Sequence, residues 1–314
     1  MRYFVKKVGI LLLTLVVISI VTFWLFHIVP GDPAASMLGT SASQEQLEDL
    51  RKELGLDQPL PTQYMNWIKG AVKGDFGTSI MYKKPVAKLL KGKLSVTLIL
   101  GAMALAIVIL IGIPLGVFTA GRKHAVSEQI LNMLNLLGIS FPGFFLSILL
   151  IWVFGLVLHW FTPGRFVTFS RNPAGFFRSM IFPAIAIAIP QTCILSKYIR
   201  SAVIEEIRAD YVRTARSKGS TKNRIMYVHV LKNAIVSVVP LIGMIVSGIF
   251  SGSIVIEQVF GIPGIGRLLI ASVTSRDYPT VQTLVMYIAI LILVVNFIVD
   301  ILIQILDPRI RIAQ

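Results

Sequence analysis

The stretch Lys197–Lys232, KYIRSAVIEEIRADYVRTARSKGSTKNRIMYVHVLK, interrupts an otherwise strongly apolar chain. Apolar runs lie on both sides of it, so both of its ends are held close to lipid. A Lys or Arg at the centre of a bilayer costs about 2.5–3.5 kcal/mol on insertion scales, which keeps such a stretch out of the membrane. The sequence therefore predicts a polar segment between two membrane spans, called the basic loop below.

The composition indicates a membrane protein. Of the 314 residues, 55% are hydrophobic and 14% are charged, whereas soluble domains carry about 25% charged residues. The net charge of +15 comes mainly from Lys and Arg at the ends of apolar runs and in the loops between them, a pattern typical of lipid partners and not of nucleic acid. The single Cys193 excludes an internal disulfide, and the four histidines are too scattered to predict a metal site.

Six apolar runs are long enough to cross a hydrocarbon core of roughly 30 Å. The first is too long for the apolar part of a signal peptide and is followed by no small-residue cleavage site, so we expect an anchor. The third is over-long and contains Gly138 and Pro142-Gly143, which predict a kink or an interfacial lead-in. The runs are Val8–Val29, Val96–Ala120, Ile130–Trp160, Ile181–Ile199, Ile235–Ile256 and Val281–Leu306.

The short loops predict that the N-terminus, the C-terminus and the basic loop all face the cytoplasm, because they carry most of the Lys and Arg. The segment 30–93 is also rich in Lys, but loops beyond about 60 residues are translocated largely regardless of charge. We expect an N-terminal membrane helix (1–29), an extracytoplasmic cap (30–93) and a five-helix core (94–314). In the cap, Ser43 can begin a helix through Glu53 with Leu47, Leu50 and Leu54 on one face, a second helix is expected over Pro61–Val72, and Gly74–Ser79 reads as a turn.

The centre of the basic loop, Glu205–Gly219, predicts a short helix. Ile207, Tyr211 and Ala215 recur every fourth residue and would share one face, with Val212 beside it. The cationic residues point elsewhere: Arg208, Arg213, Arg216 and Lys218.

The end of this helix and the start of the next are also signalled. Gly219 suits the position after the last helical turn, where a positive φ is common, and Ser220 or Thr221 can cap the following helix. These signals alone are equally compatible with an ordinary basic cytoplasmic loop, which most multi-span proteins possess.

The basic loop resembles the EAA loop of permease subunits of binding-protein-dependent ABC importers. Members of the peptide and nickel branch read Asp-Tyr-Val-Arg-Thr-Ala-Arg-x-Lys-Gly, which stands unbroken at Asp210–Gly219. The general pattern of the family is matched at Ala215, Gly219 and Leu231 and departed from at Arg213, Thr214, His229 and Lys232. Other stretches resemble B-type permeases of dipeptide and oligopeptide systems: Val29–Pro33, Leu54–Leu60, Phe76–Ser79, Glu257–Gly266, Asp277–Pro279 and Leu306–Arg311.

The resemblance implies an all-α membrane protein with six transmembrane helices and the type I ABC importer permease fold, in a bacterial inner membrane. Its expected partners are a second, C-type permease, two ATPases that bind ATP and Mg²⁺, and an external substrate-binding protein. Its cargo would be di- or oligopeptides, or nickel or a metal chelate. The residues expected to couple to an ATPase are Ile207, Asp210, Tyr211, Arg213, Thr214, Ala215, Arg216, Lys218 and Gly219. Those expected at an outer gate or binding-protein contact are Glu257, Phe260, Gly261, Pro263, Gly264 and Gly266.

The chain has no G-x-x-x-x-G-K-[ST] run, so we expect no nucleotide cofactor and no ATP hydrolysis in it. Candidates for a translocation path are Ser247, Ser251 and Ser253 in the fifth span, where small residues serve close helix packing equally well. Asp300 in the sixth span is another candidate, with pairing to a basic loop residue as the alternative. A secondary transporter or channel, or an intramembrane enzyme, is less consistent with the sequence, since it shows no inverted repeat and no paired catalytic groups.

Overall fold

The structure is a computed structural model that describes residues 2–28, 33–38, 43–53, 55–121 and 126–306. Within these ranges the chain is helical, and its one extended pairing is an isolated antiparallel bridge between Thr78 and Pro85. Several features of the sequence lie outside the described residues: 29–32 of the Val29–Pro33 match, Leu54, and 307–311 of the final match. The basic residues Arg122 and Lys123, which follow the second apolar run and contribute to the predicted orientation, also lie outside them.

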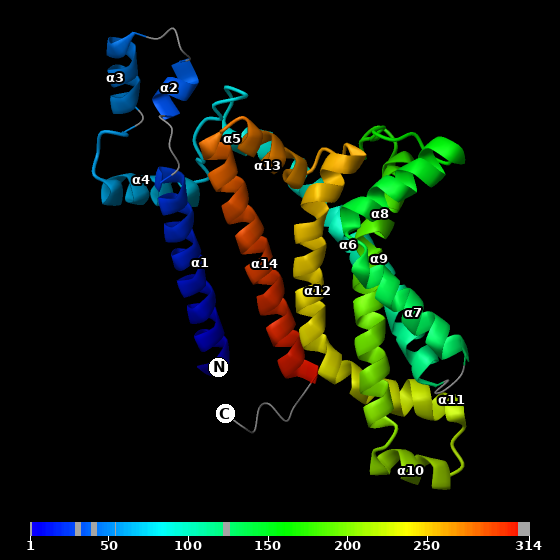
Figure 1. The fold of residues 1–314 in the computed structure, drawn as a ribbon. Coiled ribbons are helices and arrows are strands. Elements are labelled where there is room, and N and C mark those ends of the chain that lie inside the picture. The colour runs from blue at the N-terminus through cyan, green and yellow to red at the C-terminus, as the bar shows by residue number, and fades with distance from the viewer. Residues whose placement is uncertain (1, 29–32, 39–42, 54, 122–125, 307–314) are drawn as a thin grey trace. The chain divides into compact units, whose positions relative to one another are not determined.

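The helices follow the apolar runs and the amphipathic segments between them (Figure 1). In chain order they are α1 Arg2–Ile28, α2 Pro33–Leu38, α3 Gln44–Glu53, α4 Leu60–Val72, α5 Val86–Leu90, α6 Lys93–Ala120, α7 Val126–Ser140, α8 Gly143–Leu150, the π-helix η1 Ile151–Val157, α9 Pro173–Glu206, α10 Asp210–Ser217, α11 Lys222–Arg224, the π-helix η2 Ile225–Val230, α12 Leu231–Phe260, α13 Ile265–Thr274 and α14 Tyr278–Leu306.

Five helical stretches among the described residues are long and apolar enough to cross a membrane, and a broken pair brings the total to six. The pair joins Glu128–Ser140 to Gly143–Val157 with a bend of 101°, which confirms the kink predicted at Pro142-Gly143. Helices α9 and α12 run well beyond the apolar runs from which they were predicted. Their polar ends lie beyond the hydrocarbon core, where charged helix formers continue the same helix.

The described chain divides into two compact units. Unit 1 comprises residues 1–96 and 264–293, and unit 2 comprises residues 97–263 and 294–314. Both units are discontinuous in sequence, because segments distant in sequence share a core. In unit 1 a hydrophobic cluster unites α5 with α13 and the start of α14, through Val86, Leu90, Ile265, Leu268 and Leu284.

The predicted helices of the outer segment are present in unit 1. Ser43 begins α3 as expected: its Oγ accepts a hydrogen bond from the Gln46 amide at 3.2 Å, and the Gln46 side chain accepts one from the Ser43 amide at 3.1 Å. Helix α4 matches the second predicted helix. It packs aromatic residues on α1, where Phe23 contacts Tyr64 and Trp67 with ring centroids 5.4 and 6.1 Å apart.

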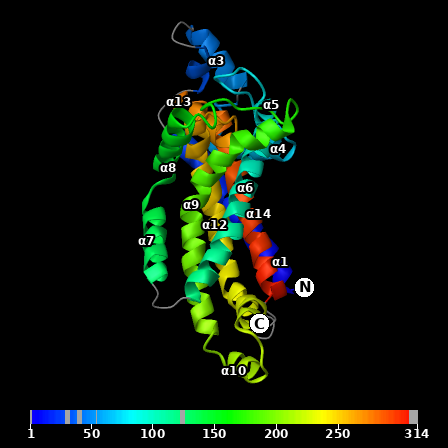
Figure 2. The same cartoon turned by 90° about the vertical axis from the view of Figure 1, so that its right-hand side faces the viewer.

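Unit 2 is built around α9, against which α7, α8 and α12 pack (Figure 2). Glycines let α6, α7 and α12 approach α9 closely, because a Cβ at each would collide with a side chain of α9. A Cβ at Gly116 would lie 2.7 Å from Ile199, one at Gly138 would lie 2.4 Å from Cys193 Sγ, and one at Gly248 would lie 2.8 Å from Gln191.

Candidate functional site

The centre of the basic loop forms a short helix of its own. Helix α9 ends at Glu206, Ala209 is extended with ψ 148°, and α10 then begins at Asp210. Figure 1 shows α10 lying crosswise at the end of α9. The chain therefore leaves the apolar part of unit 2, presents two turns of helix, and returns through α11 and η2.

The structure corrects the predicted helix face at Ile207. This residue caps α9 and lies outside α10, because the extended Ala209 separates the two helices. The buried residue of α10 is instead Val212, which is 0% exposed, and α10 packs against η2. Tyr211 and Ala215 are half-buried on either side of it. One apolar side chain thus anchors a helix whose other predicted coupling residues, Asp210, Arg213, Thr214, Arg216 and Lys218, are exposed.

Charges on α10 follow the helix dipole. Asp210 lies in the first turn and Arg216 in the last, where each charge stabilises the adjacent helix end. The Arg213 guanidinium lies 3.9 Å from the Asp210 carboxylate, and both side chains are strongly exposed. Such a pair adds little stability because water and salt screen it. The cationic groups of α10 are therefore presented mainly to the exterior.

Tyr211 connects the helix to the end of α9. Its hydroxyl donates a hydrogen bond to Glu206 Oε2 at 2.6 Å. Partial burial, followed by this bond to a carboxylate, raises the pKa of Tyr211 above its ordinary value. The phenol is therefore protonated at neutral pH, and the hydrogen bond spans the turn at Ile207–Ala209.

The end of α10 is closed by the glycine that the sequence indicated. Gly219 has φ +77°, its amide donates to the Arg216 carbonyl at 2.9 Å, and the Ser220 amide donates to the Ala215 carbonyl at 3.1 Å. These two bonds form a Schellman motif. Thr221, one of the two predicted caps, then accepts a hydrogen bond from the Arg224 amide at 3.4 Å through its hydroxyl.

The predicted outer-loop residues fall at the end of α12 and the start of α13. Glu257 is 0% exposed and accepts a hydrogen bond at 2.5 Å from Thr97 Oγ1 on α6. Phe260 is buried, and Gly261 ends α12 with φ +71°. The expected loop is shorter than predicted: Pro263 and Gly264 connect the helices, with Gly264 capping α13, whereas Gly266 lies inside α13.

The candidates for a translocation path differ in exposure. Ser251 is exposed, Ser247 is half-buried and donates to the Gly243 carbonyl at 3.0 Å, and Ser253 is 0% exposed and donates to the Phe250 carbonyl at 2.8 Å. Asp300 is half-buried on α14. None of these four residues lines the cavity beside the basic loop.

Thr97 and Val212 are contributors that the sequence interpretation did not single out as site residues. No local signal could have found Thr97, because its partner Glu257 is 160 residues away. Val212 carried a weak signal, since it is the one large aliphatic residue inside a strongly charged octet.

Two family models match consecutive parts of the chain. The description "binding-protein-dependent transport system inner membrane component" matches residues 112–312, and the N-terminal model of the same kind of component matches residues 1–101. The chain belongs to this family. As an inner membrane component, it is a multi-pass protein of a bacterial inner membrane and the permease part of its transport system.

Individual relatives of this inner membrane component align over nearly its whole length. The oligopeptide transport system permease protein AppB of Bacillus subtilis is 34% identical over 98% of this chain and 99% of its own. A Brucella abortus protein assigned to a peptide transport system as its permease is 39% identical over 98% of both chains. A Sinorhizobium fredii protein assigned as a peptide ABC transporter permease is 31% identical over 98% of this chain and 99% of its own.

Proposed function

We propose that this chain is the B-type permease subunit of an ATP-driven importer, which moves di- or oligopeptides delivered by an external substrate-binding protein. The observation that carries the proposal is α10: a two-turn basic helix between two apolar helices, fixed by one buried side chain and by capping at its end. The names of the aligned relatives support peptides as cargo. Nickel or a metal chelate is the second candidate cargo, because the sequence resemblance extends to that branch.

In the proposed complex, a second C-type permease and two ATPases complete the transporter, and the ATPases bind the ATP and Mg²⁺. Helix α10 would face the cytoplasm and seat against one ATPase. A rigid helix joined to membrane spans at both ends can transmit a displacement, and exposed cations on it can steer an acidic partner surface. The outer end of α12, at Gly261, would face the binding protein, whereas the buried Glu257 would hold this end against α6.

The proposal is tested by purifying the tagged chain together with its co-expressed partners and reconstituting the complex in liposomes. We expect uptake of peptide only with ATP, the binding protein and both ATPases present. Uptake by this chain alone without ATP would overturn the importer assignment in favour of a secondary transporter or channel. Thermal shifts of the binding protein with peptides and with nickel complexes would decide between the two cargoes.

Ala215 provides the sharper variant. Ala215→Trp places a bulky group on the half-buried face of α10, and we expect ATP hydrolysis to lose its dependence on peptide while the complex still inserts. The matched control is Ala71→Trp, another half-buried alanine in a short amphipathic helix, α4. Equal loss of coupling in both variants would contradict the assignment of α10.

A further inference from the structure

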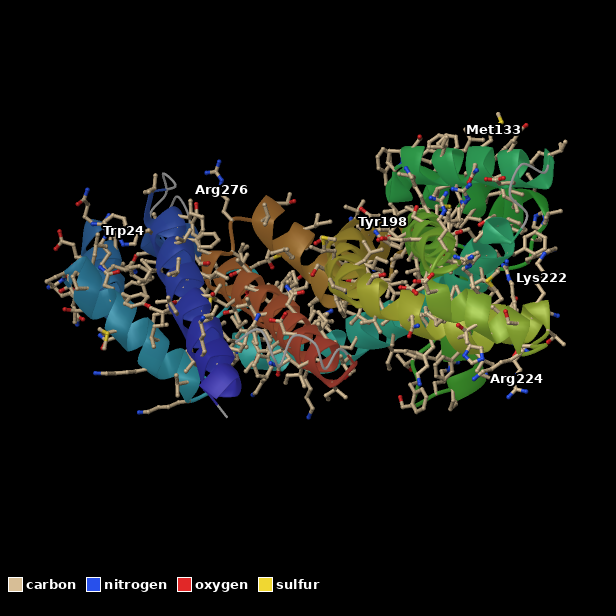
Figure 3. All side chains as sticks on the ribbon, turned by 90° about the horizontal axis from the view of Figure 1, so that it is seen from below. Trp24, Met133, Tyr198, Lys222, Arg224 and Arg276 are labelled. Carbon is tan, nitrogen blue, oxygen red and sulfur yellow. The ribbon has the colours of Figure 1, made fainter. Side chains whose placement is uncertain are left out.

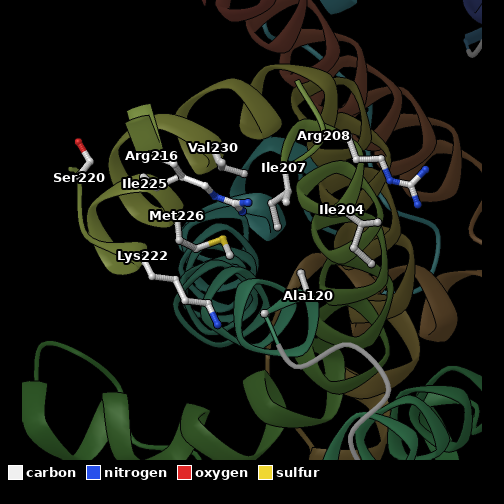
Figure 4. A pocket seen from close by; sticks show the side chains of 11 residues that line it. Ala120, Ile204, Ile207, Arg208, Arg216, Ser220, Lys222, Ile225, Met226 and Val230 are labelled. Atoms are coloured by element: carbon white, nitrogen blue, oxygen red, sulfur yellow. The ribbon is translucent and has the colours of Figure 1, made fainter. Parts of the chain in front are cut away.

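A cavity of about 560 Å³ lies in unit 2 beside the basic loop (Figure 4). Its wall comes from the last turn of α6, the end of α9, one residue of α10, and the α11–η2 segment. This volume is within the range of cavities that hold small ligands. The proposed transport of peptides assigns no role to the cavity itself, although two of its lining residues, Ile207 and Arg216, are also expected to couple to an ATPase.

One part of the wall is apolar. Ile225, Met226 and Val230 are buried residues of η2, and Ile204 and Ile207 come from the end of α9. The methyl end of Met226 lies 3.9 Å from the position of a Cβ built on Gly121, so it reaches across the cavity toward the end of α6. Such a surface favours hydrocarbon over water.

The rest of the rim is cationic. Arg208, Arg216 and Lys222 line the cavity, and none of its described lining residues is acidic. In Figure 4, Arg216 extends toward Ile207 and Lys222 passes below Met226, whereas Arg208 extends away from the centre. The carboxylate of Glu206, nearby in sequence, accepts the Tyr211 hydrogen bond. Among its described lining residues, the rim therefore carries three cations and no carboxylate.

The position of the cavity sets the depth at which a ligand would bind. Ala120 is the last residue of the apolar α6, and Val230 immediately precedes α12. The cavity thus lies where apolar helices give way to the polar loop. Lipid headgroups occupy this depth, and basic pockets between transmembrane helices on the cytoplasmic side bind anionic ones.

We propose that this cavity binds an anionic glycerophospholipid, with its phosphate on Arg216 and Lys222 and the start of an acyl chain against Ile207 and Met226. A free phosphate would leave the apolar wall without a partner. Arg216 is the one α10 residue in the lining, so the exposed cations Arg213 and Lys218 remain available to another partner. This site rests on the membrane setting of the chain and is independent of its cargo.

The test uses the purified complex in neutral detergent, with binding measured by native mass spectrometry and by thermal shift. The probes are dihexanoyl-phosphatidylglycerol, dihexanoyl-phosphatidylcholine and inorganic phosphate. The double variant Arg216→Gln with Lys222→Gln should weaken phosphatidylglycerol binding by about 10- to 30-fold. The control Arg224→Gln with Lys232→Gln removes the same charges from exposed residues outside the lining and should bind within about twofold of the unmodified complex. Figure 3 shows Arg224 at the outer edge of the loop.

A second variant separates lipid from simple anion binding. Gly121→Phe fills the apolar side near Met226 but keeps all three cations, and the Cβ itself meets only ordinary contacts. We expect it to abolish phosphatidylglycerol binding. Equal binding by all variants, or protection by phosphate as strong as by the lipid, would overturn the proposal. So would a double variant that loses its ATPases but binds the lipid normally, because the cavity would then belong to the protein partner.

Discussion

Two polar segments of this permease follow opposite designs. Helix α10 in unit 2 is anchored by Val212 and displays charged side chains to the exterior. The start of α14 in unit 1 is fixed by Asp277, whose carboxylate is 0% exposed and accepts hydrogen bonds from Ser79, Ile80 and Thr280. The contrast teaches that burial of polar groups fixes one segment internally, whereas exposure leaves the other available to a partner.

The energetics of the two segments differ accordingly. At Asp277 the donors lie 2.5 Å (Ser79 Oγ), 3.0 Å (Ile80 N) and 2.8 Å (Thr280 Oγ1) from the carboxylate oxygens. Hydrogen bonds to a buried charge are among the strong ones, and removing the acceptor strands every donor. In α10 the polar contacts are local and largely solvated. Local unfolding of α10 would therefore lower the stability of the rest of the fold only slightly.

The largest expected effect comes from breaking the buried segment. Asp277→Ala leaves three donors without an acceptor, and we expect it to lower the free energy of unfolding by about 3–5 kcal/mol. Thr280→Val removes a single donor and should cost about 1 kcal/mol. Thermal unfolding in detergent, followed by tryptophan fluorescence, measures both. If Asp277→Ala lowers the free energy of unfolding no more than Thr280→Val does, the Asp277 carboxylate does not hold this segment together.

The next largest effect is expected at two glycines that have similar positive φ angles. Gly219 (φ +77°) in the basic loop and Gly74 (φ +81°) in the outer segment both have open space around a built Cβ. Alanine at either position should therefore cost about 1–2 kcal/mol of local stability through backbone strain alone. Hydrogen exchange should show this loss at each site, with asparagine milder than alanine because it tolerates a positive φ.

Gly219→Ala and Gly74→Ala should differ in how much peptide is transported per ATP hydrolysed. We expect Gly219→Ala to lower the peptide transported per ATP hydrolysed in liposomes, because the end of α10 frays. Gly74→Ala should leave that ratio unchanged. A similar loss in both variants would show that general destabilisation, and not the position of α10, determines coupling.

A smaller effect is expected at Tyr211. Tyr211→Phe removes the hydrogen bond to Glu206 and should weaken protection of α10 amides from exchange by about 1 kcal/mol. Burial and Glu206 raise the pKa of Tyr211 in the folded state, so its contribution is complete below the unfolded value near 10 and is lost as pH rises through the folded pKa. The difference between Tyr and Phe should accordingly narrow only above about pH 10. A difference that narrows near neutral pH would exclude this bond as its source.

The smallest effect on stability is expected at the exposed pair of α10. Arg213→Ala removes the 3.9 Å contact with Asp210, and the midpoint of thermal unfolding should move by less than about 1 °C. Under the proposed function, association with the ATPases should nevertheless weaken, most clearly at low salt. A large loss of thermal stability without a change in association with the ATPases would show that α10 stabilises the fold and does not bind a partner.

Local signals in the sequence accounted for much of the fold. Ser43, Thr221 and Gly219 mark helix ends where the structure places them, because caps and positive φ angles depend on the residue itself. The bend at Pro142-Gly143 was predictable for the same reason. Each of these features depends only on residues that are a few positions apart in the chain, so it can be predicted from a single sequence.

Features that depend on distant partners were not predictable. Glu205–Ala209 consists largely of good helix formers, so nothing local announces that Ala209 is extended and that Ile207 leaves the helix. The Thr97–Glu257 bond and the role of Asp277 arise only when segments far apart in sequence meet. Helix α13 was missed because its glycine-rich start resembles a loop and its ten residues are too few to span a membrane.

The bend between α7 and α8 has a consequence for how the chain enters the bilayer. Each arm, Val126–Ser140 and Gly143–Val157, is about 22 Å long. A helix needs about 30 Å to cross the hydrocarbon core by itself, so neither arm can do so alone. Both arms pack on α9, which is synthesised after them. Stable insertion of this bent segment is therefore expected to depend on α9, the helix that follows it in the chain.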